Sequence, residues 1–508
     1  MYRSCIYRMS TKEKRSIWLP FLISLFIMIL LFGCFMQPHY SSDSYANLHN
    51  IDVAVHIRNG RIISAIVQKT MNLIRFNPVQ HQSLTIAVSL CVLALCITLI
   101  YLEIRPNLKG KLTAEILVLL SLQLVFANVF FSEWLMYVES ATIICIVGPL
   151  LLSVSIVLAG REITWKRITV SFLLLLAALN IYQLYIEFYL TLSLLIVYTR
   201  AEGLLTKHTL GHSAVIALVA LLACVITIAI QSTLPQLFGI VAGDRTAVFD
   251  LEKLLGNLKV ISRAWKPVSL NAYGLLPNAV FPVVWVILFT LMLREHFRCH
   301  NFGNRILYSL IAIGTIALLT YAPHIISSVV WMAPRTIVGT FHVPMYMAVS
   351  IGVTQASIPE QKNRILKMTI TVVLAFLMIN AYATNGVLTN AIANNRMDQY
   401  CANEIQVRID QYQSETGIVV NKLGICNDQS PVYRYLGVKY VTHDLNIRAM
   451  NVEWGSTNLI NYYCGKNYEN VSIPAEVYET YFSGKNWDFL NLDEQAVFIG
   501  DTLYLAMY

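Results

Sequence analysis

Apolar runs of about twenty residues recur along this chain, and they constrain its fold more than any other feature. The first run, Ile17–Met36, is long enough to cross ~30 Å of hydrocarbon as a helix. In lipid the backbone must satisfy its own hydrogen bonds, so such runs are expected to be helical. With 56% hydrophobic and 13% charged residues, the chain is predicted to be an α-helical polytopic membrane protein.

Eleven transmembrane helices are expected within a membrane domain that covers residues 1–385. We place them at residues 17–36, 84–104, 112–131, 141–159, two within 168–198, 213–230, 277–293, 306–321, 337–354 and 368–384. Two large loops, 37–82 and 231–276, separate some of these helices on the outer side. The first loop has helical periodicity without the length to span, which predicts one or two helices lying in the membrane interface.

Positive charge before the first apolar run sets the expected orientation. Five basic residues precede this run: Arg3, Arg8, Lys12, Lys14 and Arg15. The positive-inside rule therefore places the N-terminus in the cytoplasm and residue 43 on the outer side. The run is too long for a signal peptide and lacks a small-residue cleavage site, so we expect a retained first helix.

Residues 168–198 are too long for one span and short for two. The side on which later basic loops would then lie decides between these interpretations. Read as one span, they would place two later basic clusters outside: Arg294/Arg298/Arg305 and Lys362/Arg364/Lys367. Two short spans that meet near Tyr182–Gln183 place both clusters inside, as the rule requires. Polar residues of this hairpin, Asn180, Gln183 and Glu187, are then expected near its outer turn.

The apolar runs stop after residue 385, and residues 386–508 are predicted to form an extracytoplasmic C-terminal domain. This part holds 8 Lys/Arg against 14 Asp/Glu. We expect a helix over 390–415, followed by a small mixed α/β unit. Its cysteines, Cys401, Cys426 and Cys464, allow a disulfide in an oxidising compartment, with the pairing left open.

Several classes of chemistry are disfavoured by the sequence. The net charge of +8 comes from short loops between spans, so it is not a nucleic-acid signal. No Gly-rich phosphate loop or nucleotide fingerprint occurs in the expected cytoplasmic loops, and no Cys/His spacing typical of a metal site appears. We therefore expect no cofactor and no metal, and an outer active site would need a substrate already in the membrane.

Asp43 is the first catalytic candidate. It lies in HYSSDSYAN (His39–Asn47), directly after the first apolar run. A carboxylate so close to the hydrocarbon boundary suggests a functional site, and it could act as general base for a hydroxyl that attacks an anomeric carbon. The alternative is an ordinary capping or surface aspartate.

A second pair of carboxylates, Glu133 and Glu139, lies in the short outer turn SEWLMYVES. Such a turn stays close to the membrane, so one or both are expected to face the same cavity as Asp43. Glu133 is preferred because Ser132 and Trp134 flank it, and an aromatic ring could stack on a sugar. Ordinary interfacial carboxylates are the alternative.

The candidate binding residues are basic and lie on the outer side. Arg58 and Arg61 are three apart and would share a helix face, where they could hold a phosphate. The alternative is a pair of interfacial arginines bound to anionic lipid headgroups. Arg335 follows Pro334 in a short outer loop, and His324 could be a second proton-transfer or phosphate group. Lys266 is added to this set, although its segment is amphipathic and basic, a pattern that favours contact with anionic lipid headgroups.

Several short motifs resemble the Gtr-type glucosyl transferases, the family that modifies O-antigen. They are the segment Asn59–Arg61, the turn Phe130–Trp134, the hairpin Ile181–Gln183 and Ala333–Arg335 before the tenth span. The layout also resembles that family: a basic N-terminus, one span, an outer loop with an acidic residue and an outer C-terminal domain.

The resemblance implies a GT-C-class enzyme of the bacterial inner membrane. Such an enzyme moves a hexose, typically glucose, from a polyprenyl-phosphate carrier to a surface polysaccharide such as O-antigen. It further implies Asp43 and Glu133 as the catalytic acids, and Arg61 and Arg335 as the groups that neutralise the departing phosphate. The expected partners are the lipid-linked sugar, the polysaccharide acceptor and membrane lipid. Asp43 has no acidic neighbour in sequence, unlike the paired acids of other GT-C enzymes, so metal independence is expected.

Two other classes of protein remain open from the sequence. A transporter or flippase of lipid-linked saccharides would also need many spans and a polar cavity, but the chain shows no duplicated halves. A non-catalytic assembly or anchoring protein would need no buried carboxylate.

Overall fold

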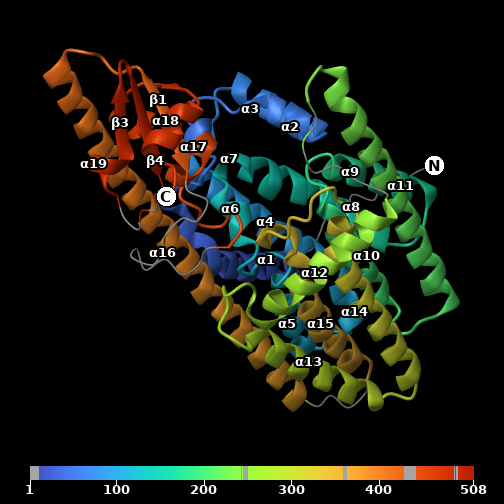
Figure 1. The fold of residues 1–508 in the computed structure, drawn as a ribbon. Coiled ribbons are helices and arrows are strands. Elements are labelled where there is room, and N and C mark those ends of the chain that lie inside the picture. Colours follow the sequence, from blue (N-terminus) through green and yellow to red (C-terminus); the bar gives the residue numbers. More distant parts are fainter. Residues whose placement is uncertain are drawn as a thin grey trace.

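The protein is an elongated helical body that carries a small sheet domain at one end (Figure 1). The structure is a computed structural model that describes residues 11–241, 243, 250–358, 363–427, 442–485, 487 and 490–507. Of the residues in the expected basic clusters, Arg3, Arg8 and Lys362 lie outside this described part.

The helices of the body follow the expected order of spans. They are α1 (Thr11–Phe32), α4 (Gln82–Ile104), α5 (Leu112–Gln123), α6 (Ser132–Met136), α7 (Val138–Ala141), α8 (Gly148–Gly160), α9 (Trp165–Leu179), α10 (Tyr185–Arg200), α11 (Lys207–Leu237), α13 (Val280–Phe297), α14 (Phe302–Ile325), α15 (His342–Ser357) and α16 (Asn363–Thr416). A π-helical stretch, Thr142–Val147, joins α7 to α8.

Seven helical segments in the described part of the chain are long and apolar enough to cross a membrane. They lie in α1, α4, α7–α8, α11, α13, α14 and α16. The other four expected spans correspond to α5, α9, α10 and α15, which have 12, 15, 16 and 16 residues. These are shorter than the ~20 residues of a full span, so the count of eleven stays a prediction.

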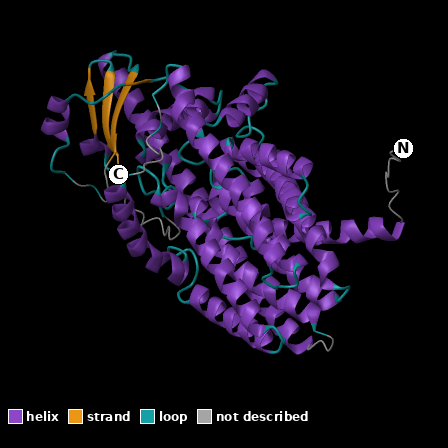
Figure 2. Ribbon diagram, turned by 90° about the vertical axis from the view of Figure 1, so that its right-hand side faces the viewer, coloured by secondary structure: helices purple, strands orange, loops and turns teal. Residues whose placement is uncertain are grey.

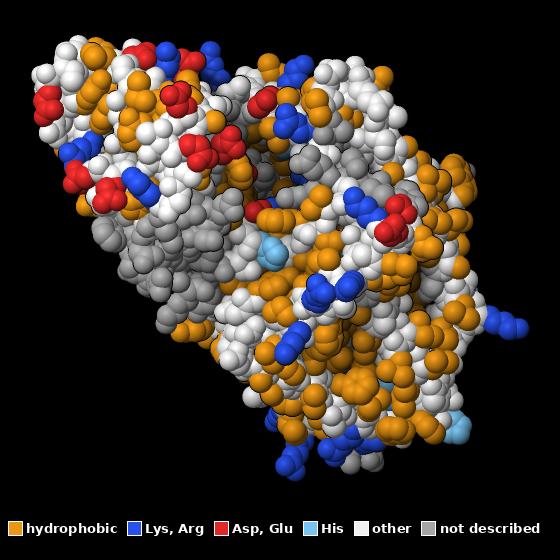
Figure 3. Space-filling model, viewed as in Figure 1, with side chains coloured by type: hydrophobic (Ala, Val, Ile, Leu, Met, Phe, Trp, Pro, Cys, Tyr) orange, Lys and Arg blue, Asp and Glu red, His pale blue; other side chains and the backbone are white. Residues whose placement is uncertain are grey.

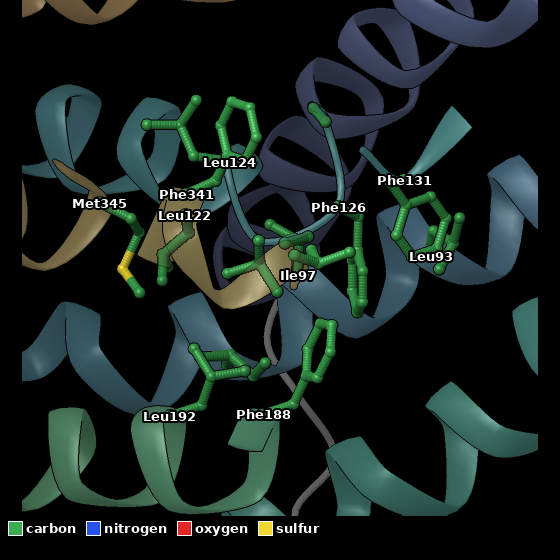
Figure 4. Packing of buried hydrophobic residues seen from close by; sticks show 14 of the residues in the cluster. Leu93, Ile97, Leu122, Leu124, Phe126, Phe131, Phe188, Leu192, Phe341 and Met345 are labelled. Carbon is green, nitrogen blue, oxygen red and sulfur yellow. The ribbon is translucent and has the colours of Figure 1, made fainter. Parts of the chain in front are cut away.

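The prediction of a single helix over the third expected span, residues 112–131, is wrong. Helix α5 ends at Gln123, and the chain then turns irregularly through the core. Side-chain amides replace the missing helical partners: Val129 N donates to Asn380 Oδ1 at 2.9 Å, and Phe131 N donates to Asn128 Oδ1 at 3.0 Å. The segment is apolar and buried. In Figure 4, Phe131 lies beside Leu93 of α4, and Phe126 lies beside Ile97 of α4 and Phe188 of α10.

The prediction that residues 168–198 form two helices is confirmed. Helix α9 ends at Leu179 and α10 begins at Tyr185, so the break falls at Tyr182–Gln183 as expected. Asn180 closes α9 by donating from Nδ2 to Leu176 O at 2.8 Å. The hairpin turn therefore presents irregular backbone at the end of the body that faces the C-terminal domain (Figure 1).

Helices occupy the two large loops, as the periodicity of the first loop predicts for that loop. The loop 37–82 contains α2 (Val53–Arg58) and α3 (Ile62–Leu73), and the loop 231–276 contains α12 (Leu251–Asn271). In Figure 1, α2 and α3 lie across the top of the body beside the C-terminal domain.

Helix α16 joins the body to the C-terminal domain without a break. It runs for 54 residues and passes through the boundary expected near residue 385. At 1.5 Å per residue it is about 80 Å long. The eleventh expected span and the expected helix over 390–415 are thus one element.

The C-terminal domain is a mixed α/β unit, which Figure 2 shows at one end of the molecule. Its four-stranded sheet has the order β2-β1-β4-β3, in which β1 is parallel to β2 and β4, while β3 is antiparallel to β4. The elements are β1 (Lys422–Asn427), α17 (Glu453–Cys464), β2 (Glu469–Asn470), α18 (Ala475–Tyr481), α19 (Leu492–Gln495), β3 (Ala496–Ile499) and β4 (Thr502–Met507).

Two hydrophobic clusters form the interior. The larger lies among the membrane helices, and the smaller lies between the sheet, α17 and the end of α16. Tyr45 and Leu48 of the loop 37–82 belong to the smaller cluster. The loop that carries Asp43 is therefore packed on the C-terminal domain as well as on the membrane helices.

A buried ion pair fixes the C-terminal domain to α16. Arg448 Nε donates to Asp398 Oδ1 at 2.8 Å and Ala449 N donates to Asp398 Oδ2 at 3.0 Å, with both charged side chains at most 2% exposed. Removal of one partner leaves a buried charge unpaired, which costs about 3–5 kcal/mol.

We predict that Asp398→Ala lowers the apparent melting temperature of the detergent-solubilised protein and exposes the C-terminal domain to limited proteolysis. The control is Arg408→Ala. Arg408 is also on α16, and this change breaks its exposed ion pair with Asp493 of α19, so it should alter the melting temperature and the proteolysis little. Equal effects of the two variants would show that the buried pair does not hold the domain.

Candidate active site

A cavity of about 1010 Å³ lies where the loops 37–82 and 231–276, α10, α11, α14 and the C-terminal domain meet. In Figure 3 the surface is hollowed between the C-terminal domain and the helices α2 and α3. Five of the predicted site residues line the cavity: Asp43, Arg58, Arg61, His324 and Arg335. They come from three separate parts of the chain, which the fold brings together.

Asp43 lies half-buried in the loop after α1, and the C-terminal domain fixes its carboxylate. Trp454 Nε1 of α17 donates to Asp43 Oδ1 at 2.8 Å, and Ser41 Oγ accepts from Asp43 N at 3.2 Å. Burial raises the pKa of Asp43, while the hydrogen bond from Trp454 and the charge of Arg335 oppose that rise. A carboxylate with a raised pKa is a better proton acceptor, as a general base requires.

Arg335 lies in the short 3₁₀ turn Pro334–Thr336 and is held by two carboxylates. Its Nη2 donates to Asp444 Oδ2 at 2.7 Å, and its Nη1 donates to Glu133 Oε1. The guanidinium carbon also lies 4.9 Å from the centre of the Tyr137 ring. The guanidinium therefore has a fixed orientation at the cavity wall.

Glu133 is the partner of Arg335 and does not itself line the cavity among the described residues. Its side chain is fully buried, and Arg335 N donates to its Oε2 at 2.7 Å. Burial raises the pKa of Glu133 to about 6, and Arg335 opposes that rise. Glu133 therefore acts on the cavity through Arg335.

Arg58 and Arg61 flank the turn between α2 and α3. The Arg61 guanidinium carbon lies 4.9 Å from the centre of the Tyr182 ring, at the hairpin between α9 and α10. In the same hairpin, Gln183 Nε2 donates to Asn59 O at 3.4 Å. Two of the short motifs from the sequence, Asn59–Arg61 and Ile181–Gln183, are thus neighbours in space.

Charge divides the cavity into two sides. Asp43, Asp444 and the buried Glu133 surround one cation, Arg335, so this side has an excess of negative charge. Arg58 and Arg61 line the cavity at the hairpin between α9 and α10, where the Arg61 guanidinium lies over the Tyr182 ring. The Trp134 ring links Arg61 to Arg335. Its centre lies 4.9 Å from the centre of the Tyr182 ring, and its Nε1 donates to Arg335 O at 2.8 Å. Such a division suits a ligand with a phosphate at one end and hydroxyl groups at the other.

The other predicted binding residues differ in position. His324 lies at the end of α14, lines the cavity and is within 3.4 Å of Thr336 O through Nε2. Lys266 is exposed on α12 and is not among the described residues that line the cavity. The structure therefore brings His324 to the site and leaves Lys266 outside it.

Sequence reasoning did not single out Asp444, and it treated Trp454 only as one of several C-terminal aromatics. Both line the cavity and both come from the C-terminal domain. It also preferred Glu133 to Glu139, whose buried carboxylate accepts from Ser41 Oγ at 3.3 Å and Ser44 Oγ at 3.1 Å. Glu139 thereby holds the loop on both sides of Asp43, and it and Asp444 are the acidic neighbours that Asp43 lacks in sequence.

The described residues contain no group of three or more His, Cys, Asp or Glu side chains placed to hold a metal ion. The expectation of a metal-independent site stays a prediction.

The turn between α2 and α3 requires a glycine at position 60. Its φ of +66° is in the left-handed region, and a Cβ at this position would lie 2.3 Å from Gln231 Cα on α11. The turn that carries Arg58 and Arg61 is thus pressed against the wall of the cavity.

We predict that Gly60→Ala loosens this turn. The amides of Gly60 and Arg61, which donate to Ile57 O and His56 O at 2.9 Å, should then exchange with solvent faster in hydrogen-exchange mass spectrometry. Gly110→Ala is the matched control, because Gly110 has a φ of +68° but no neighbouring atom within 4 Å of its Cβ position. Both changes introduce a left-handed alanine, which costs roughly 1–2 kcal/mol. Only Gly60→Ala adds the collision, so equal local effects would contradict this explanation.

Similarity to known proteins identifies the family of this chain. No curated protein matches the chain. The family model described as Glucosyl transferase GtrII matches residues 31–354, which include Asp43, Arg58, Arg61, Glu133, His324 and Arg335. Asp444 and Trp454 lie beyond the matched region. The match covers more than half of the chain, and the protein therefore belongs to the GtrII family of glucosyl transferases.

Proposed function

We propose that the protein transfers a hexose, most simply glucose, from a polyprenyl-phosphate donor to a surface polysaccharide such as O-antigen. The reaction would take place on the outer face of the bacterial inner membrane. The observation that carries this proposal is the divided cavity, which has a general-base candidate on one side and two arginines on the other, within a glucosyl transferase family.

The lining of the cavity supports a lipid-borne donor. Below the charged groups it continues along apolar side chains of three helices: Leu190 of α10, Leu221, Cys224 and Ile228 of α11, and Leu319 of α14. A polyprenyl chain suits these surfaces because it gains free energy from burial of apolar area. The donor phosphate would then lie at Arg58 and Arg61, and its sugar would point toward Asp43.

The proposed reaction is a single displacement with inversion at the anomeric carbon. Asp43 takes the proton from an acceptor hydroxyl as the hydroxyl oxygen attacks that carbon. The bond from the anomeric carbon to the phosphate oxygen breaks, and polyprenyl phosphate leaves as a monoester. This step adds negative charge to the phosphate, so Arg58 and Arg61 stabilise the transition state more than the ground state.

Arg335 has a different part in this proposal. Both ends of its guanidinium are engaged by Glu133 and Asp444, so the donor phosphate is assigned to Arg58 and Arg61. Arg335 instead holds Asp444 in place and limits the repulsion among the carboxylates. His324 lines the wall of the same cavity, where its ring is positioned by Thr336 O.

The distribution of basic residues supports the proposed orientation. Lys and Arg side chains line the end of the helical body farthest from the C-terminal domain (Figure 3). Arg294 and Arg298 lie exposed at the end of α13, in that part of the body. Under the positive-inside rule this end faces the cytoplasm, and the cavity faces outward.

We predict that Asp43→Asn lowers transfer by roughly 10²–10⁴-fold, the usual contribution of a general base. Transfer is measured in membrane vesicles with radiolabelled polyprenyl-phosphate glucose and the acceptor polysaccharide. Asp52→Asn is the control, because Asp52 is exposed in the same loop and caps α2 through Ala54 N, a bond that Asn can also make. Normal transfer by a well-expressed Asp43→Asn protein would remove Asp43 as the base.

We also predict that Arg61→Ala raises the KM for the donor and lowers kcat, with a combined loss of roughly ten- to a hundredfold from the missing charged contact. Arg61→Lys should recover part of this loss, since Lys keeps the charge but not the two-pronged geometry. Lys266→Ala, which removes a cation outside the cavity, should leave both parameters unchanged. An equal effect of Arg61→Ala and Lys266→Ala would place the phosphate elsewhere.

A further inference from the structure

A second cavity, of about 590 Å³, lies beside the first between the outer loop 37–82 and the C-terminal domain. We call it the tyrosine groove. Its lining residues are Pro38, Tyr40, Leu48, His49, Val79, Gln80, His81, Gln82, Ser83, Leu84 and Tyr462. Three parts of the chain form it: the loop that holds Asp43, the start of α4 and the end of α17.

We propose that the tyrosine groove binds the acceptor as a chain of uncharged sugar residues whose reacting end reaches Asp43. The proposal rests on the proposed function, since it names where the acceptor of that reaction is held. It assigns to the C-terminal domain and the first outer loop a binding site separate from that of the donor.

The side chains of the tyrosine groove suit saccharides. Tyr40 and Tyr462 line it and belong to an aromatic cluster with Tyr45 and Tyr463, whose neighbouring ring centres lie 5.1–5.8 Å apart. Tyr462 is 43% exposed, so one of these rings is offered to a ligand. Aromatic rings give an apolar face to a sugar, while hydroxyl, amide and imidazole groups exchange hydrogen bonds with its hydroxyls.

Charge separates the tyrosine groove from the donor cavity. Among the described residues that line the groove there is no Asp, Glu, Lys or Arg, and its only titratable groups besides the tyrosines are His49 and His81. The donor cavity, by contrast, is lined by three arginines. An anionic lipid headgroup is held by cations, so the groove favours a neutral ligand over a second phospholipid or a second donor.

The tyrosine groove and the donor cavity are linked by two continuous pieces of chain. Tyr40 lines the groove and Asp43, three residues later, lines the donor cavity. On α17, Tyr462 lines the groove and Trp454 contacts Asp43. Eight residues of helix separate these two side chains, about 12 Å at 1.5 Å per residue. A polymer can bridge that distance and a single sugar cannot, so the acceptor is expected to be an oligosaccharide or longer.

Hydrogen bonds hold the walls of the tyrosine groove in place without a ligand. Tyr40 N donates to Asn395 Oδ1 and Asn395 Nδ2 donates to Tyr40 O, both at 2.9 Å, which ties the loop to α16. Gln80 Nε2 donates to Leu48 O at 2.7 Å on the other wall. A preformed groove loses less conformational entropy on binding, which favours affinity for a flexible polymer.

The test compares two tyrosines of the same domain. Tyr462→Ala should raise the KM for the acceptor roughly three- to tenfold, the worth of one aromatic contact, with the KM for the donor unchanged. Tyr478→Ala is the matched control, because Tyr478 on α18 is 42% exposed and does not line the groove. Full-length protein in lipid nanodiscs is assayed with polyprenyl-phosphate glucose and with glucose-free fragments of several repeats from the surface polysaccharide of the same bacterium.

Binding measured without transfer separates this proposal from the proposed function. The same fragments are titrated into Asp43→Asn protein and followed by saturation-transfer NMR, with Tyr462→Ala and Tyr478→Ala introduced into that background. Weaker binding with Tyr462→Ala alone supports the groove. If transfer requires Asp43 and Arg61 but the two tyrosine variants behave alike, the groove proposal fails while the donor site stands. A Tyr462→Ala protein with a raised KM for the donor, or with loss of bound phospholipid, would overturn the proposal in favour of a lipid site.

Discussion

The guanidinium of Arg335 is the contact on which the candidate site depends. It joins α6 of the membrane body, through Glu133, to the C-terminal domain, through Asp444. Burial strengthens these ion pairs and also makes each partner necessary to the others, because a lone charge in this position would be poorly solvated. The cavity wall is therefore built jointly by two parts of the protein, and the half supplied by the C-terminal domain lies beyond the region matched by the family model.

The same shared construction determines the chemistry of Asp43. Its loop is packed on the small hydrophobic cluster of the C-terminal domain, and Trp454 directs one carboxylate oxygen. Burial and the nearby Asp444 raise its pKa, while Trp454 and Arg335 limit that rise. A general base benefits from both properties, a raised pKa and a fixed direction of its carboxylate. The C-terminal domain supplies the hydrogen bond that fixes the direction.

Much of the site could be predicted because topology sorts side chains by the end of the body on which they lie. Asp43, Arg58, Arg61, His324 and Arg335 share one cavity, as expected for residues on one side of the membrane. The break between α9 and α10 followed from the charges of loops far along the chain. Lys266 shares the predicted side but not the cavity, because sidedness does not determine the position within the outer surface.

The parts of the site and fold that could not be predicted from the sequence depend on contacts between residues far apart in the chain. Trp454 meets Asp43 across 411 residues, and Asp444 meets Arg335 across 109. Neither pairing leaves a local pattern, since hydropathy and spacing report only on neighbours along the chain. The third span failed for a similar reason. Asn128 and Asn380 satisfy the backbone after α5, so an apolar segment can remain buried without being helical.

Helix α16 sets the rotation of the C-terminal domain relative to the membrane helices. Its 54 residues contain no proline, and the helix passes from the membrane helices into the C-terminal domain without a hinge. Each residue of an α-helix advances the chain by 1.5 Å and turns it by about 100°. An insertion or deletion of one residue in the C-terminal half of α16 would therefore rotate the sheet domain about the helix axis. That rotation would move Asp444 and Trp454 away from the cavity. The length of α16 therefore fixes how the C-terminal domain is oriented toward the cavity.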